Sequence, residues 1–304
     1  MLLPRMSSVS APEPIDSPRD EFAQSLKARD VEGPLDLLFY RPVGLRLARF
    51  FAACRLTPDH VTLLGTIAGV LAGHLYFYRA LSLNVVGMVL HITANLLDNV
   101  DGQLARLTKR QSETGKVIDG IGDYLVFLSV YVHLSLRFVA GGGSQLIWSV
   151  ALAAALCHGV QSAAAEFSRD AYARFASGRS MQLQSSRALR ARKKLLMRLH
   201  AQYAATQERA LPALALLRDH LPPTLPDWFA QEYRATHSGV PRRSRLLGTN
   251  TRMLAIFAAL LLRQPLWYFV FEIAILNVIF IWLRTRENSA CRRLLEMISE
   301  RGTH

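Results

Sequence analysis

Long apolar runs alternate with polar connections over most of this chain. Six runs approach or exceed the length needed to cross about 30 Å of hydrocarbon as helices. They are approximately His60–Ala80, Leu83–Leu107, Val117–Val139, Gln145–Glu166, Leu246–Leu262 and Leu266–Leu283. The fifth run is the shortest and ends at Arg263-Gln264-Pro265. The pattern predicts an all-α integral membrane protein with six transmembrane helices, four in residues 57–166 and two in residues 246–284.

The remaining segments have a different composition. Residues 1–33 are polar and proline-rich, lack the apolar core of a signal peptide, and are predicted to be disordered. Residues 34–56 mix Leu and Phe with Arg, which suits an N-terminal helix along the membrane interface that Pro42 begins or kinks.

A long insertion, residues 167–245, separates the fourth and fifth apolar runs. Its apolar residues recur at helical spacing, with Pro212 as a point of interruption. It is predicted to be a cytoplasmic helical insertion, either a simple subdomain or a lid that selects the acceptor, and residues 285–304 are predicted to be a cytoplasmic tail.

Basic residues indicate the orientation. The chain has 36 Lys and Arg against 23 Asp and Glu, a net charge of +13. They gather in residues 41–55, 109–116, 169–245 and 284–293, whereas the alternate connections are nearly uncharged. The positive-inside rule therefore predicts that both termini and the insertion face the cytoplasm. The run Arg187–Lys194 could suggest nucleic acid, but no nucleic-acid-binding module accompanies it, and attraction to anionic membrane lipids explains it better.

Four aspartates, Asp98, Asp101, Asp119 and Asp123, stand within the second and third apolar runs. The spacing is D-x-x-D-G-x-x-A-R, then eight residues, then G-x-x-x-D-x-x-x-D. At about 100° per residue, each pair shares a helix face with residues of little or no side chain. A carboxylate in mid-membrane costs about 2.5–3.5 kcal/mol, so such residues are usually kept for function. Their hard oxygen ligands suit Mg²⁺ or Mn²⁺, and two such ions commonly serve displacement at phosphorus.

This pattern resembles the signature of the class I CDP-alcohol phosphotransferases. The matching positions are Asp98, Asp101, Gly102, Ala105, Arg106, Gly115, Asp119 and Asp123. Thr57–Thr62 also resembles the segment that opens the first membrane helix in many members, so the resemblance covers roughly residues 41–123. It implies a homodimeric, metal-dependent membrane enzyme of phospholipid biosynthesis.

The resemblance also implies roles for individual residues. All four aspartates would ligate two Mg²⁺ or Mn²⁺ ions, and Asp123 would also act as the general base. The group that binds the cytidine diphosphate would comprise Asp59, Thr62, Gly102, Ala105, Arg106, Ser112 and Gly115. An acceptor hydroxyl would lose its proton to Asp123 and attack the β-phosphorus, with release of cytidine monophosphate.

Two chemistries remain open within this class. CDP-diacylglycerol could donate a phosphatidyl group to a small polar alcohol such as inositol phosphate or glycerol phosphate, which the Thr57–Thr62 segment favours. Alternatively, a CDP-linked headgroup could pass to a lipid or soluble alcohol. A bacterial inner membrane would suit either reaction.

Two other classes of protein fit this pattern less well. A non-catalytic lipid-binding or assembly protein would be expected to lose an aspartate, and a transporter would not need the Gly, Ala and Arg of the motif. His91 could bind a ligand or satisfy a neighbouring helix, and Arg252 could bind an acceptor phosphate or anchor the interface. Cys54, Cys157 and Cys291 show no metal or redox spacing.

Overall fold

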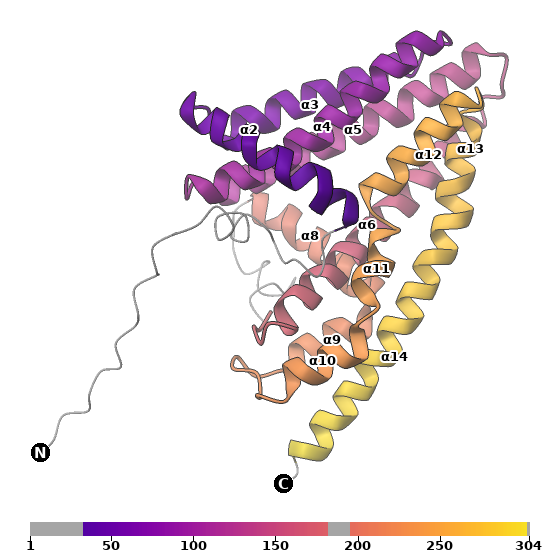
Figure 1. Cartoon of the computed structure of the whole chain (residues 1–304). Helices are drawn as coiled ribbons and strands as arrows, with labels where there is room; N and C mark the ends of the chain where they lie inside the picture. Colours follow the sequence, from indigo (N-terminus) through magenta and orange to yellow (C-terminus); the bar gives the residue numbers. More distant parts are fainter. Residues whose placement is uncertain (1–32, 182–194, 303–304) are drawn as a thin grey trace, which may run out of the picture.

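The structure is a computed structural model that describes residues 33–181 and 195–302. This part of the chain is helical and contains no β-strand. One group of helices comprises α2 (Arg41–Ala53), α3 (Pro58–Leu75), α4 (Leu81–Leu107) and α5 (Glu113–Ala140), which lie together in Figure 1. A short π-helix, η1 (Asp36–Tyr40), precedes α2.

A second group follows along the chain. It comprises α6 (Ile147–Phe175), α8 (Leu195–Ala210), α9 (Pro212–His220), α10 (Phe229–His237), α11 (Val240–Arg245), α12 (Thr249–Leu261), α13 (Leu266–Val270), η3 (Phe271–Ile275) and α14 (Leu276–Gly302). In Figure 1 the short helices α9 and α10 lie beside the C-terminal half of α14, away from α12 and α13.

Four helices are long and apolar enough to cross a membrane. They are Leu81–Leu107, Val117–Ala140, Ile147–Phe175 and Leu266–Glu300. These helices confirm the prediction of an all-helical integral membrane protein, although not its six spans. At about 1.5 Å per residue, the 13 residues of α12 reach only about 20 Å, short of the hydrocarbon thickness.

Side-chain caps define where α3 and α5 begin. The Thr57 hydroxyl accepts a hydrogen bond from the His60 backbone N–H, and Pro58 occupies the first turn of α3. The Ser112 hydroxyl accepts from the Gly115 backbone N–H at 2.9 Å and caps α5. The caps therefore place Asp59 and Thr62 in the first turns of α3, and Asp119 in the second turn of α5.

Glycines let α3 approach its neighbours closely. A Cβ added to Gly69 would lie 2.5 Å from Val126 Cγ2 on α5, and one added to Gly73 would lie 2.5 Å from Ser129 Oγ. A Cβ on Gly122 would collide with Thr66. Small residues at helix contacts are typical of membrane proteins, where close backbone packing favours association. This packing holds α5 closely against α3.

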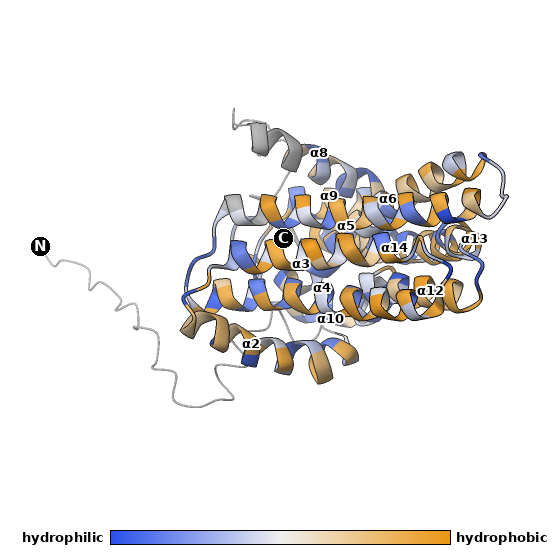
Figure 2. Ribbon diagram, turned by 90° about the horizontal axis from the view of Figure 1, so that it is seen from above, coloured by the Kyte–Doolittle hydropathy of each residue, from blue (hydrophilic) through white to orange (hydrophobic). Residues whose placement is uncertain are grey.

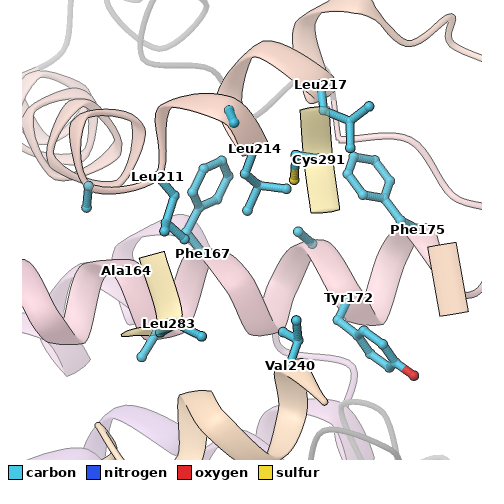
Figure 3. Close-up of a cluster of buried hydrophobic side chains, with 14 of the residues drawn as sticks. Ala164, Phe167, Tyr172, Phe175, Leu211, Leu214, Leu217, Val240, Leu283 and Cys291 are labelled. Carbon is cyan, nitrogen blue, oxygen red and sulfur yellow. The ribbon is translucent and has the colours of Figure 1, made fainter. Parts of the chain in front are cut away.

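A second core lies away from this group, where α6 and α14 pack against the insertion helices. Figure 3 shows Leu211 and Leu214 near Phe167, and Leu217 near Phe175, with Cys291 in the same cluster. The apolar residues of this core explain why α6 continues beyond the predicted end at Glu166. They also explain why α14 runs to Gly302 through the segment predicted as a tail.

Within the insertion, the predicted interruption at Pro212 is confirmed. Helix α8 ends at Ala210 and α9 begins at Pro212, with Leu211 outside the helical conformation. The predictions for residues 1–32 and for the basic run Arg187–Lys194 lie outside the described residues.

Candidate active site

A cavity opens between α3, α4 and α5, and all four predicted aspartates line it. Asp98 and Asp101 come from α4, and Asp119 and Asp123 come from α5. Thr62 lines it from α3, and Thr249 from the first turn of α12. The close packing of α3 on α4 and α5 therefore gathers side chains that the sequence separates.

Three of the aspartates form a compact group. One carboxylate oxygen from each of Asp98, Asp119 and Asp123 lies within 4.8 Å of the others. Asp98 and Asp123 are exposed and Asp119 is half-buried, so the group is open to the cavity. Three convergent hard oxygen donors fit a divalent cation such as Mg²⁺ or Mn²⁺.

Asp101 is held differently from the other three. It is buried, and its Oδ2 accepts a hydrogen bond from the Thr62 hydroxyl at 2.6 Å. It lies beside the group of three and interacts electrostatically with Asp98 and Asp119. Thr62 thus fixes the orientation of one predicted ligand from the neighbouring helix.

The residues predicted to bind the nucleotide fall into two places. A Cβ added to Gly115 would lie 3.0 Å from Ser112 Oγ and 3.3 Å from Asp59 Oδ1, so these three residues meet where α3 and α5 begin. On α4, a Cβ added to Gly102 would lie 3.5 Å from Arg106 Nη1. The Arg106 guanidinium therefore lies close over Gly102. Ala105, which is half-buried, lies about one helical turn after Gly102.

Sequence reasoning missed some residues of the cavity. Asn95 lines it and donates to Asn250 Oδ1 at 2.9 Å, and Asn250 donates to Asp36 Oδ1 at 3.2 Å. Asn95 precedes Asp98 by three positions and shares its helix face, so helical spacing could have found it. Thr249 could not be found this way, because only tertiary packing brings α12 to α4.

His91 and Arg252 have structural partners. His91 is buried, lines the cavity, and lies with Nδ1 3.1 Å from the Tyr76 hydroxyl, so it satisfies a neighbouring helix. Arg252 is buried, with Nε 3.0 Å from Glu272 Oε1 and Nη2 2.8 Å from Gln161 Oε1. Arg252 is therefore the buried partner of Glu272 and not an interfacial anchor, whereas its contact with an acceptor phosphate stays a prediction.

These features together indicate an integral membrane protein with an acidic cavity, a candidate metal site, near the ends of two apolar helices. Residues 55–193 match the family model of the CDP-alcohol phosphatidyltransferases. This match agrees with the resemblance that the aspartate signature indicates, and it includes all four aspartates.

Two curated bacterial relatives are similar to part of this chain. The phosphatidylinositol phosphate synthase of Streptomyces avermitilis is 31% identical over 116 residues, which is 38% of this chain and 46% of that protein. The phosphatidylinositol phosphate synthase of Cutibacterium acnes is 31% identical over 104 residues, 34% of this chain and 49% of that protein. The chain thus spans about half the length of the curated relatives it matches.

Thr62→Val is expected to lower turnover, because it removes the hydrogen bond to Asp101 while nearly preserving side-chain volume. Loss of a partner that orients a metal ligand typically costs about 10–100-fold. Thr62→Ser keeps the hydroxyl and is expected to retain most activity. Cytidine monophosphate release by both variants, compared at equal folded protein, checks this. Equal activity of the Val and Ser variants would contradict a positioning role for the hydroxyl.

Proposed function

We propose that this chain transfers a phosphatidyl group from CDP-diacylglycerol to a small polar alcohol and releases cytidine monophosphate. The convergence of Asp98, Asp119 and Asp123 within a CDP-alcohol phosphatidyltransferase domain is the observation that carries this proposal. The intact carboxylate set also argues against a non-catalytic membrane protein.

The carboxylates would hold the cations that the family generally requires. Asp98, Asp119 and Asp123 would bind Mg²⁺ or Mn²⁺ directly, and Asp101, oriented by Thr62, would complete the ligand set for a second ion. When bound, such ions neutralise diphosphate charge and stabilise the charge that develops at phosphorus.

The protein's own groups would perform the remaining steps. Asp123 would accept the proton of the acceptor hydroxyl, whose oxygen then bonds to the β-phosphorus as the bond to cytidine monophosphate breaks. Arg106 offers a planar, permanently charged donor for phosphate oxygens, and the absence of a side chain at Gly102 leaves the α4 backbone accessible beside it. Asp59 and Ser112, which meet at Gly115, would border the nucleotide.

The relatives favour an inositol phosphate as the acceptor, since both are phosphatidylinositol phosphate synthases. Glycerol phosphate is the second acceptor of the same chemical type. Transfer of a CDP-linked headgroup is the alternative reaction. The two reactions differ in their donor, so identifying the donor distinguishes them.

The membrane placement is part of the proposal. Leu63, Ile67 and Leu71 recur along α3 at four-residue spacing and are each about half exposed, a pattern that suits contact with lipid. In Figure 2 hydrophobic residues likewise recur along α3, α4 and α12. We infer that α3 and α12 complete a six-span bundle, in which the bilayer thins locally around the short α12. Both termini would then lie in the cytoplasm of a bacterial cell, with the protein in the inner membrane. A homodimer remains a prediction from the family resemblance.

Purified full-length protein is expected to release cytidine monophosphate from CDP-diacylglycerol and inositol phosphate when Mg²⁺ or Mn²⁺ is present. Chelation should abolish release, and either cation should restore it. A parallel set with CDP-linked headgroups tests the alternative donor. If cytidine monophosphate is released only from the CDP-linked headgroups, the proposed phosphatidyl transfer is wrong. If folded protein releases none from either type of donor, the proposed function is wrong.

A further inference from the structure

A second group of metal-ligating side chains lies in the core between α6, α10 and α14. His237 ends α10, and Glu287 and Cys291 lie one turn apart on α14. The ligand atoms of all three lie within 4.8 Å of one another. The three side chains are at most 1% exposed. The group belongs to the second core, in which Figure 3 shows Cys291, and is separate from the aspartate cavity.

The spacing of the donor atoms fits a zinc ion. His237 Nε2 and Cys291 Sγ are 3.6 Å apart. With Zn–N of about 2.0–2.1 Å, Zn–S of about 2.3 Å and a tetrahedral angle, two such ligands would be separated by about 3.6 Å. Histidine, cysteine and glutamate are also the residue types that bind zinc in proteins.

Other side chains already orient the donors. His237 Nδ1 lies 2.8 Å from the Thr236 hydroxyl, and the His237 ring stacks on Tyr233 at a centroid distance of 4.0 Å. Glu287 Oε1 accepts from the buried Ser168 hydroxyl at 3.2 Å. Ligands of bound metals are typically fixed by such outer contacts, which leave the other nitrogen or oxygen directed at the ion.

Two buried polar atoms at the group lack partners. Among the described residues, neither Glu287 Oε2 nor the Tyr233 hydroxyl has a hydrogen-bond partner, and Glu287 forms no ion pair. Buried polar groups are almost always satisfied, so each exception calls for a missing partner. A divalent cation supplies one, since the carboxylate of Glu287 and the thiolate of Cys291 together balance its charge.

A catalytic thiol explains these features less well. The proximity of His237 to Cys291 could suggest a nucleophile, but the sulfur is fully buried and reactive cysteines are normally accessible. A simple S–H to nitrogen hydrogen bond would explain the 3.6 Å contact alone. It would leave the Glu287 carboxylate and the Tyr233 hydroxyl unsatisfied.

We propose that His237, Glu287 and Cys291 bind a structural zinc ion that joins α10 of the insertion to the middle of α14. The fourth position is available to the Tyr233 hydroxyl, which interacts electrostatically with Glu287 and Cys291, or to water. The ion fixes the insertion to the last membrane helix and is independent of the phosphatidyl reaction.

Full-length protein purified in detergent tests the site with Zn²⁺ alone as the probe. Excess Mg²⁺ is added to occupy the aspartate cavity, weakly bound metal is removed by desalting, and zinc is counted by mass spectrometry. About one zinc per chain is expected. Cys291→Ser and Glu287→Gln should each reduce this to below about a tenth, whereas Cys54→Ser changes an exposed cysteine and should not.

Replacing zinc with cobalt gives a second readout. It is made on the wild-type protein and so does not depend on whether the variants of the ligand residues fold. Wild-type protein loaded with Co²⁺ should show a thiolate-to-metal charge-transfer band, which Cys54→Ser retains. The milder variant Ser168→Ala should weaken zinc binding about 10–100-fold. Folded wild-type protein that takes up no zinc and shows no thiolate band would overturn the proposal. Zinc uptake unchanged by Cys291→Ser and Glu287→Gln would also overturn it.

Discussion

Asp123→Asn is expected to reduce cytidine monophosphate release by about 10²–10⁴-fold, the contribution typical of a positioned general base. The amide preserves the size of the side chain, but it can neither accept the acceptor's proton nor supply the negative charge that Asp123 adds to the carboxylate group. Turnover should therefore fall without loss of the fold, because the exposed side chain packs into no core.

The measurement is initial-rate release of cytidine monophosphate at saturating donor and acceptor, with thermal unfolding followed in parallel. Asp227→Asn is the matched control, since it makes the same chemical change at an exposed aspartate outside the cavity. It should leave both activity and unfolding temperature unchanged. If the Asp123→Asn protein turns over at the wild-type rate, Asp123 is not the general base and another group accepts the proton.

Helical spacing is sufficient to predict that the four aspartates face one region. This prediction depends only on the 3.6-residue helical repeat and on the expectation that two helices joined by a short connection lie side by side. Sequence does not separate Asp101 from the other three, since that difference depends on Thr62 in a helix some forty residues earlier. The hydrogen bonds from Asn95 to Asn250 and from Asn250 to Asp36 could not be predicted for the same reason, because they join three segments that are distant in sequence.

Hydropathy located the membrane segments better than it located the helix ends. It detects the apolar parts of α6 and α14 but does not detect that both helices continue through the more polar residues beyond Glu166 and Leu283. These residues are helical because Phe175 and Leu294 pack into the core that the insertion helices form. The group of His237 and Cys291 was missed for the same reason, since more than fifty residues separate them.

Arg252→Met is expected to lower the free energy of unfolding by about 3–5 kcal/mol, the usual cost of removing one partner of a buried ion pair. Glu272 is fully buried, with both carboxylate oxygens within 3.3 Å of Arg252 Nε. Without the guanidinium, its charge would remain in the helix bundle uncompensated. The Gln161 oxygen and the Leu247 carbonyl would also lose a donor.

Thermal unfolding in detergent should show this as a fall in the unfolding temperature on the order of 10 °C. Arg284→Met is the matched control, because Arg284 is exposed on α14 and its loss should change the temperature little. The double variant Arg252→Met with Glu272→Met removes both charges and should recover much of the stability, since an apolar pair can replace a buried ion pair. A double variant as unstable as Arg252→Met would mean that the bonds to Gln161 and Leu247, and not the charge of Glu272, make Arg252 necessary.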